Sequence, residues 1–177
     1  MMTVITGSLR GRVLETLDGE ATRPTAQRVK EALFSAIQFD IEGRRVLDAF
    51  AGSGQLGIEA LSRGAASCLF IDSARDAAEI VRKNVTAVGM GPVSTVLCQD
   101  TMTYLRTARE RFDLIFLDPP YASGLLIPAM EAAAALLTPG GILVCESDAD
   151  TSLPEAAGEF PLYRSYRYSH VKLWIYR

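Results

Sequence analysis

A short apolar run that turns through glycines into a helix is the feature that most constrains the fold of this chain. The residues 46–50 have the composition of a buried strand, and the segment after them carries Gly52, Gly54 and Gly57. Glycine lets the backbone approach a ligand closely and adopt φ angles that a side chain would forbid. Open α/β sheets bind their ligands in the crevice at such a turn. The sequence therefore predicts a cofactor-binding crevice in an α/β fold.

The same alternation of strand and helix continues along the chain. It is typical of a mostly parallel sheet. The last two apolar runs alternate aromatic and basic residues, and we expect them to close the sheet as an antiparallel pair at 162–168 and 171–176. The other strands are predicted near 45–50, 67–72, 94–98, 112–117 and 142–145, and the helices between them at 54–63, 75–88, 101–108 and 125–137.

A short extension precedes this core. We expect a hairpin near the N-terminus and then an amphipathic helix, with Thr25 as its N-cap. The length of 177 residues is that of one domain. We therefore predict a single domain, 1–177, in which 1–40 form the extension and 41–177 form a Rossmann-like core.

Acidic residues stand where the predicted strands end. Asp48 closes the strand before the glycine loop, and Asp72 closes the next strand, twenty residues after Gly52, where an acid can bind both ribose hydroxyls of a nucleotide. Asp100 follows the third strand and can accept a hydrogen bond from an adenine amino group. Asp118 follows the fourth. One such acid is usually a turn or cap residue, but four in successive strands favour a binding site.

The identity of the cofactor depends on the charge beside the glycines. Their spacing also occurs in dinucleotide-binding oxidoreductases, so an NAD-dependent enzyme stays open as an alternative. Asp48 lies four residues before the first glycine, where it would repel a pyrophosphate and attract an ammonium group. S-adenosylmethionine has an amino acid head and a sulfonium and no phosphate, so it is the cofactor that we predict. The residues expected to bind it are Asp48, Phe50, Ala51, Gly52, Ser53, Gly54, Asp72, Asp100 and Asp118.

The tetrapeptide Asp118-Pro119-Pro120-Tyr121 has the groups needed to hold a planar amino group. Proline fixes its own φ and restricts the residue before it to extended conformations, so this turn is stiff. The Asp118 carboxylate and the Pro119 carbonyl can each accept a hydrogen from an exocyclic amine, and the Tyr121 ring can stack on a nucleobase. We therefore predict that these four residues are catalytic in chemistry on a base nitrogen.

Composition and charge exclude several other classes of function. The hydrophobic fraction of 49% is that of a globular protein, and the sequence shows neither a bilayer-length apolar stretch nor a signal peptide, so we expect a cytoplasmic protein that binds no membrane. The single His170 cannot complete a histidine-rich site, so no metal is expected. Cys68, Cys98 and Cys145 are predicted to be reduced core thiols. The net charge is -3, although both ends of the chain are locally basic.

A set of motifs is spread over nearly the whole chain: Thr6-Gly7, Arg10-Gly11-Arg12, Thr22-Arg23-Pro24-Thr25, Arg28-Val29-Lys30-Glu31, Leu33-Phe34, Asp48-Ala49-Phe50-Ala51-Gly52-Ser53-Gly54, Gly57, Glu59-Ala60-Leu61-Ser62-Arg63-Gly64-Ala65 and Asp118-Pro119-Pro120-Tyr121. Together they resemble the RsmD-type bacterial methyltransferases, which modify the exocyclic amine of a guanine in small-subunit ribosomal RNA. The glycine loop and the Asp-Pro-Pro-Tyr motif occur in many methyltransferases. The segment 22–25 with its following helix is the part that is specific to this family.

The resemblance implies a class I methyltransferase fold, S-adenosylmethionine as methyl donor, and 16S rRNA as substrate, within the small ribosomal subunit or an assembly intermediate. Two positions depart from the family pattern. The family commonly has Glu where this chain has Asp72, and Tyr-Gly where this chain has Tyr168-Ser169-His170. We expect a monomer. The residues assigned to RNA contacts are Arg10, Arg12, Arg23, Thr25, Arg28 and Tyr121.

The expected reaction is a direct in-line transfer, in which the enzyme acts mainly by orienting the target amine. The base must be unpaired or flipped to reach the site. The same Asp-Pro-Pro-Tyr motif would serve a DNA adenine methyltransferase, which the lack of a separate target-recognition domain in this chain disfavours. A methyltransferase that acts on another RNA base, an NAD-dependent oxidoreductase and an RNA assembly factor without catalytic activity also stay open as alternatives.

Overall fold

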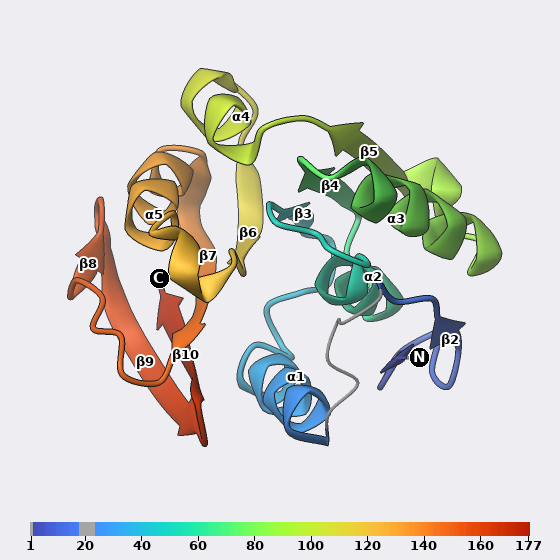
Figure 1. Cartoon of the computed structure of the whole chain (residues 1–177), viewed down its shortest axis with the longest axis horizontal. Coiled ribbons are helices and arrows are strands. Elements are labelled where there is room, and N and C mark those ends of the chain that lie inside the picture. The colour runs from blue at the N-terminus through green and yellow to red at the C-terminus, as the bar shows by residue number, and fades with distance from the viewer. Residues whose placement is uncertain (1, 18–23) are drawn as a thin grey trace.

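A mixed β-sheet runs through the centre of the protein, with helices on both of its faces (Figure 1). The computed structural model describes residues 2–17 and 24–177. In this part of the chain the order of the eight strands across the sheet is β5 (Ser94–Cys98), β4 (Ser67–Asp72), β3 (Arg45–Asp48), β6 (Phe112–Leu117), β7 (Leu137–Asp148), β10 (Val171–Tyr176), β9 (Phe160–Tyr168) and β8 (Ala156–Ala157).

The directions of these strands confirm the predicted sheet. The strands from β5 to β7 are parallel to one another. β10 is antiparallel to both β7 and β9, so the C-terminal pair closes the sheet as expected. Parallel strands that are covered on both faces are near-continuous apolar runs, and all four residues of the run 114–117 in β6 are buried.

Helices cover the two faces and enclose two separate cores. On one face lie α1 (Pro24–Ala36), α2 (Gln55–Ser62) and α3 (Arg75–Ala87), and on the other lie α4 (Thr101–Thr107) and α5 (Leu126–Ala134). The first core includes Phe34, Ile58, Val81, Phe70 and Phe116. The second core includes Met102, Leu105, Met130, Leu47 and Ile115.

Several element boundaries differ from the predictions: α5 ends at Ala134 rather than at 137, and β3 ends at Asp48 rather than at 50. β7 begins at Leu137 rather than near 142, because a bulge lets the strand continue through the Pro-Gly-Gly segment: Phe112 pairs with Leu137, and Leu114 then pairs with Ile142. The helix α1 begins at Pro24, so Thr25 lies inside its first turn and is not the N-cap. Proline is favoured at that place because its fixed φ suits the helix and its missing N–H is not needed there.

The cysteines do not share one environment. Cys68 and Cys145 are buried, and this burial raises the pKa of both thiols. Cys98 is exposed, because β5 is an edge strand of the sheet. The prediction of a core thiol is therefore wrong for Cys98. All three cysteines are free thiols.

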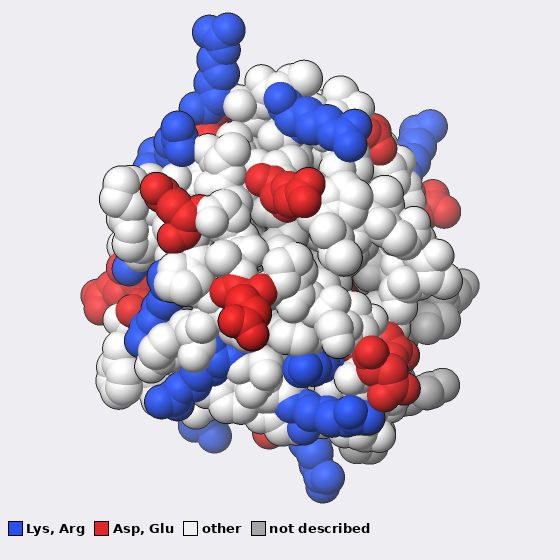
Figure 2. All heavy atoms as spheres, turned by 90° about the vertical axis from the view of Figure 1, so that its left-hand side faces the viewer, with Lys and Arg blue, Asp and Glu red and all other residues white. Residues whose placement is uncertain are grey.

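The basic residues of the C-terminal strands make local contacts. Arg164 and Arg177 lie over the Tyr163 ring, 5.1 Å and 3.6 Å from its centroid, and Arg167 pairs with Asp150 at 3.1 Å. Figure 2 shows the side of the molecule on which β8 and β9 lie, with Lys and Arg side chains scattered among Asp and Glu side chains. The basic tail is therefore part of a surface of mixed charge.

The N-terminal extension contains the predicted hairpin and packs against the core. Its strands β1 (Met2–Thr3) and β2 (Val13–Leu14) pair antiparallel. The side chain of Asn84 in α3 accepts a hydrogen bond from the Glu15 N–H and donates one to the Glu15 carbonyl, both at 2.9 Å. These two bonds hold the end of the hairpin against α3.

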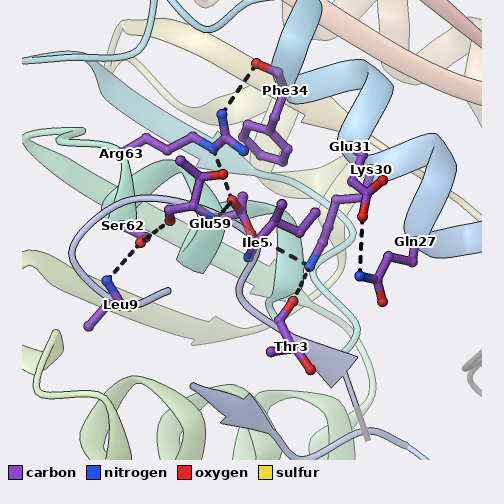
Figure 3. Close-up of polar contacts among 12 residues, drawn as sticks. Thr3, Ile5, Leu9, Gln27, Lys30, Glu31, Phe34, Glu59, Ser62 and Arg63 are labelled. Atoms are coloured by element: carbon purple, nitrogen blue, oxygen red, sulfur yellow. Dashed lines mark hydrogen bonds and ion pairs between the residues drawn. The ribbon is translucent and has the colours of Figure 1, made fainter. Parts of the chain in front are cut away.

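A buried carboxylate fastens the extension to α2 (Figure 3). Glu59 is fully buried and accepts hydrogen bonds from the backbone N–H groups of Ile5 (2.8 Å) and Thr6 (3.0 Å). It also pairs with Arg63 at 2.9 Å and with Lys30 of α1 at 3.7 Å. Burial lowers the pKa of Lys30, and the nearby Glu59 opposes this effect. A buried charge is costly unless it is paired and hydrogen-bonded, so this carboxylate fixes α1 and the extension together.

A variant without the Glu59 carboxylate should therefore unfold at a lower denaturant concentration than wild type. In Glu59→Gln the amide cannot accept all of these bonds, and two cations keep no anionic partner. We expect the free energy of unfolding to fall by about 3 kcal/mol, measured by urea unfolding followed by circular dichroism. The control is Glu79→Gln, which removes an exposed pair with Arg75 and should leave the urea midpoint almost unchanged. Equal midpoints for Glu59→Gln and wild type would contradict this role.

Candidate functional site

The carboxyl ends of the parallel strands meet at a cleft of about 670 Å³. It lies where β3 has β4 on one side and β6 on the other, which is the point at which the order of the strands reverses. Ligands of open α/β sheets bind at this point. The residues that line the cleft are Asp48, Phe50, Ala51, Gly52, Gln55, Leu56, Asp72, Ser73, Asp118, Pro119, Pro120, Tyr121 and Leu125.

The three glycines of the loop are needed for two different reasons. Gly52 and Gly54 have φ angles of 53° and 80°, in the left-handed region that favours glycine. Gly57 lies in α2, where an added Cβ would collide with the Phe70 ring and with the Cys68 sulfur on β4. The first two glycines therefore shape the loop, and the third lets the helix pack closely on the sheet.

Two of the predicted acids hold the loop in place. Asp48 is buried, and its carboxylate accepts a hydrogen bond from the Gly57 N–H at 2.9 Å, in the first turn of α2. Asp72 accepts one from the Gly52 N–H and one from the Ala74 N–H, each at 2.9 Å. Each oxygen of a carboxylate can accept more than one hydrogen bond, so Asp72 can still bind ribose hydroxyls. Its role in fixing the loop is an addition that the sequence did not reveal.

The Asp118-Pro119-Pro120-Tyr121 segment lines the same cleft as the glycine loop. After Pro120 the chain enters a short 3-10 turn, Tyr121–Ser123, in which the Pro120 carbonyl accepts a hydrogen bond from the Ser123 N–H at 2.9 Å. Tyr121 is 45% exposed, so its ring is accessible for stacking. The structure therefore brings the predicted amine-holding residues and the predicted cofactor loop into one site.

Glu146 is a residue of this region that the sequence analysis missed. It lies near the carboxyl end of β7 and accepts a hydrogen bond from the Tyr121 hydroxyl at 2.7 Å. Burial raises the pKa of Glu146, and the bond from Tyr121 opposes this effect. Burial also raises the pKa of Tyr121, and the neighbouring Glu146 carboxylate raises it further. A count of acids at strand ends, continued to the fifth strand, would have found it.

Some predicted cofactor residues lie outside the lining of the cleft. Ser53 and Gly54 belong to the glycine loop but do not line the cleft, and Ser53 is fully buried. The Asp100 carboxylate caps α4, where it accepts hydrogen bonds from the Thr103 N–H and hydroxyl, both at 2.7 Å. These bonds lower the pKa of Asp100. Its contact with adenine stays a prediction. The lining residues that the sequence analysis did not name are Gln55, Leu56, Ser73 and Leu125.

The residues assigned to RNA have different surroundings. Arg10 and Arg28 are exposed. Arg12 is exposed too, but its guanidinium donates a hydrogen bond to the Ala87 carbonyl at 2.9 Å and so helps to hold the hairpin on α3. Arg23 lies outside the described residues, as does the side chain of Thr25. Their contacts with RNA stay predictions.

The described residues contain no cluster of three or more His, Cys, Asp or Glu side chains that could hold a metal ion. None of the helices in the described part of the chain has the length and apolar character needed to cross a bilayer.

Comparison with known proteins identifies the family. The family model described as "Conserved hypothetical protein 95" matches residues 2–177. The Bacillus subtilis protein YlbH is 38% identical over 181 residues, which cover 99% of this chain and 98% of that protein. The Ribosomal RNA small subunit methyltransferase D of Escherichia coli is 33% identical over 180 residues, which cover 98% of this chain and 88% of that protein.

A solved structure supports the same relationship. The Escherichia coli protein yhhF is 30% identical and superposes with a TM-score of 0.87, over 99% of this chain and 96% of that one. Together with the strand order, this similarity shows the class I S-adenosylmethionine-dependent methyltransferase fold, with its antiparallel C-terminal pair. Because the family model and the relatives span nearly the whole chain, the protein belongs to the family of the ribosomal RNA small subunit methyltransferase D proteins.

Proposed function

We propose that this protein transfers a methyl group from S-adenosylmethionine to the exocyclic N2 amine of a guanine in the 16S rRNA of the small ribosomal subunit. The observation that carries the proposal is that the glycine loop and the Asp118-Pro119-Pro120-Tyr121 segment line the same cleft. A donor that lies on the loop and an amine held by this segment would be neighbours. The family of the chain supports RNA as the substrate.

The charge of the cleft suits a cationic cofactor. Among the described residues that line it are three aspartates, Asp48, Asp72 and Asp118, and no lysine or arginine. This lining would repel the pyrophosphate of NAD, which disfavours the oxidoreductase alternative. When bound, S-adenosylmethionine supplies an electrophilic methyl group on a sulfonium.

The positions of the residues suggest which part of the cofactor each one binds. Asp48, whose carboxylate is hydrogen-bonded to the first turn of α2, faces the amino acid head, and Asp72 accepts the ribose hydroxyls. Asp100 accepts the adenine amine. The backbone of the loop lies along the cofactor through Phe50, Ala51, Gly52, Ser53 and Gly54.

At the other wall the chain holds the target amine. The amine of guanine is a weak nucleophile because its lone pair is delocalised into the ring. Hydrogen bonds from this amine to the Asp118 carboxylate and the Pro119 carbonyl orient it and stabilise the positive charge that develops on nitrogen. Tyr121 stacks on the base, which must be flipped out of its helix to reach the cleft.

The first prediction concerns the carboxylate that holds the amine. Asp118→Asn keeps the shape of the side chain but removes its charge and one acceptor, so turnover should fall by at least about 100-fold. The measurement is incorporation of tritiated methyl groups into small ribosomal subunits from cells that lack this methyltransferase. Glu79→Gln changes an exposed acid on α3 that does not line the cleft and should keep wild-type turnover. Full turnover in a folded Asp118→Asn variant would rule out this mechanism.

The second prediction concerns the acid that holds the loop and the ribose. In Asp72→Asn one carboxylate oxygen is replaced by an NH2 group, which donates and cannot accept, so one of the two bonds from the Gly52 and Ala74 N–H groups is lost. The Kd for S-adenosylmethionine should rise at least about tenfold, or ~1.4 kcal/mol, in isothermal titration calorimetry. Asp76→Asn, on the exposed first turn of α3, should bind like wild type. An unchanged Kd in Asp72→Asn would show that Asp72 does not contribute to cofactor binding.

The third prediction concerns the RNA. If Arg10 and Arg28 contact phosphates, then Arg10→Ala and Arg28→Ala should each weaken binding to 16S rRNA and reduce by about 1 the slope of log K against log salt concentration. Filter binding over a range of salt concentrations measures this slope. Arg106→Ala, an exposed arginine on α4, is the control and should keep the wild-type slope. A wild-type slope in Arg10→Ala and Arg28→Ala would show that these two arginines do not contact RNA phosphates.

A further inference from the structure

A second, smaller cavity adjoins the Pro119-Pro120-Tyr121 segment. Its volume is about 230 Å³, below the roughly 300–1,000 Å³ that is typical of sites for whole small-molecule ligands. The segment 119–121 lines both this cavity and the cofactor cleft. The remaining lining residues include Leu126 and Ile127 of α5 and Glu146 of β7. The cavity therefore has the size and the apolar walls for part of a ligand, such as one base, next to the cleft.

The strand register places Glu146 beside Asp118. Leu117 of β6 pairs with Cys145 of β7, and Asp118 and Glu146 are the residues that follow them. Neighbouring strands are about 4.8 Å apart, so the backbones of Asp118 and Glu146 lie at adjacent positions near the carboxyl ends of the two strands. Asp118 lines the cofactor cleft, and Glu146 lines the second cavity.

Glu146 also holds Tyr121, which lines both cavities. Its carboxylate accepts the hydrogen bond from Tyr121 at 2.7 Å, which fixes the ring across the gap between the 3-10 turn and β7. A carboxylate has four acceptor sites and no donor. One bond from Tyr121 therefore leaves Glu146 able to accept a hydrogen from a base in the cavity.

The chemistry of guanine matches this pair of acids. On its Watson–Crick edge guanine has two adjacent groups that donate, the N1–H and the N2 amine, and enzymes read flipped bases at this edge. Adenine has an acceptor at N1, which would face the lone pairs of a carboxylate. Two acids on neighbouring strands therefore accept both donors of guanine and reject adenine.

We propose that Glu146 selects the target base by accepting the N1–H of the guanine whose N2 amine Asp118 holds, while Tyr121 stacks on its ring. This inference rests on the proposed function and adds the residue that makes the enzyme specific for guanine. It also gives a physical reason why the Asp-Pro-Pro-Tyr motif of this chain acts on guanine rather than on adenine.

The test compares two bases that both carry the 2-amino group. The target guanine is first mapped with the wild-type enzyme, and it is then replaced by 2-aminopurine, which has an acceptor at N1, in ligated 16S rRNA reconstituted into small subunits. Methylation rates are measured for wild type, Glu146→Gln and Tyr121→Phe. The control is Glu110→Gln, because Glu110 accepts a similar bond from Tyr104 at 3.2 Å outside both cavities.

We expect wild type and the Glu110→Gln control to methylate guanine at least about 100-fold faster than 2-aminopurine. In Glu146→Gln the amide NH2 can donate to N1 of 2-aminopurine, whereas it faces the N1–H of guanine with a second donor. The rate on guanine should therefore fall, and the preference should shrink to about tenfold or less. Tyr121→Phe, which keeps the ring and loses the hydroxyl, should keep the preference for guanine. The preference is a ratio of two rates, so it does not depend on the fraction of enzyme that is folded.

An unchanged preference in Glu146→Gln would overturn this inference. If Tyr121→Phe then lost rate to the same extent, Glu146 would act only by orienting Tyr121. A wild-type enzyme that methylates no guanine in the subunits would instead refute the proposed function itself.

Discussion

The register of the parallel strands is the constraint on which the whole site depends. The strands β4, β3, β6 and β7 are neighbours in that order, and acids lie at or near their carboxyl ends: Asp72, Asp48, Asp118 and Glu146. Adjacent strands are about 4.8 Å apart, so these acids follow one another along the same edge of the sheet, with Asp48 two residues further back in the register than Asp72 and Asp118. A slip of one residue in any strand would turn its side chains to the opposite face. The buried apolar residues of each strand therefore place the chemistry of the site.

Acids in a row repel one another, and the backbone around them offsets this repulsion. Asp48 accepts a hydrogen bond at the N-terminus of α2, where the helix dipole favours a negative charge. Asp72 accepts two backbone hydrogen bonds, and Glu146 accepts one from Tyr121. The acids are thus held in fixed positions before a ligand arrives. Such preorganisation lets a site stabilise developing charge without first rearranging.

Much of this arrangement could be predicted from the sequence, because apolar runs define strands and the predicted acids follow these runs directly. The hydrogen bond from the Gly52 N–H to Asp72 could not be predicted from the sequence, since it depends on how closely the loop approaches the next strand. Glu146 directly follows the predicted strand at 142–145 and was open to the same reasoning, but its bond from Tyr121, 25 residues away, could not be predicted from the sequence. Glu59 has the spacing of a solvated helical pair with Arg63, and only the packing of the N-terminal extension shows that it is buried.

The most direct test of the central claim is the identity of the modified nucleoside. Small ribosomal subunits from cells that lack this methyltransferase are incubated with the pure enzyme and S-adenosylmethionine, and the 16S rRNA is digested to nucleosides for mass spectrometry. The row of acids beside the Asp-Pro-Pro-Tyr segment predicts a gain of N2-methylguanosine at a single position. A gain of methylated adenosine, or no methylated nucleoside from an enzyme that binds S-adenosylmethionine, would contradict this account.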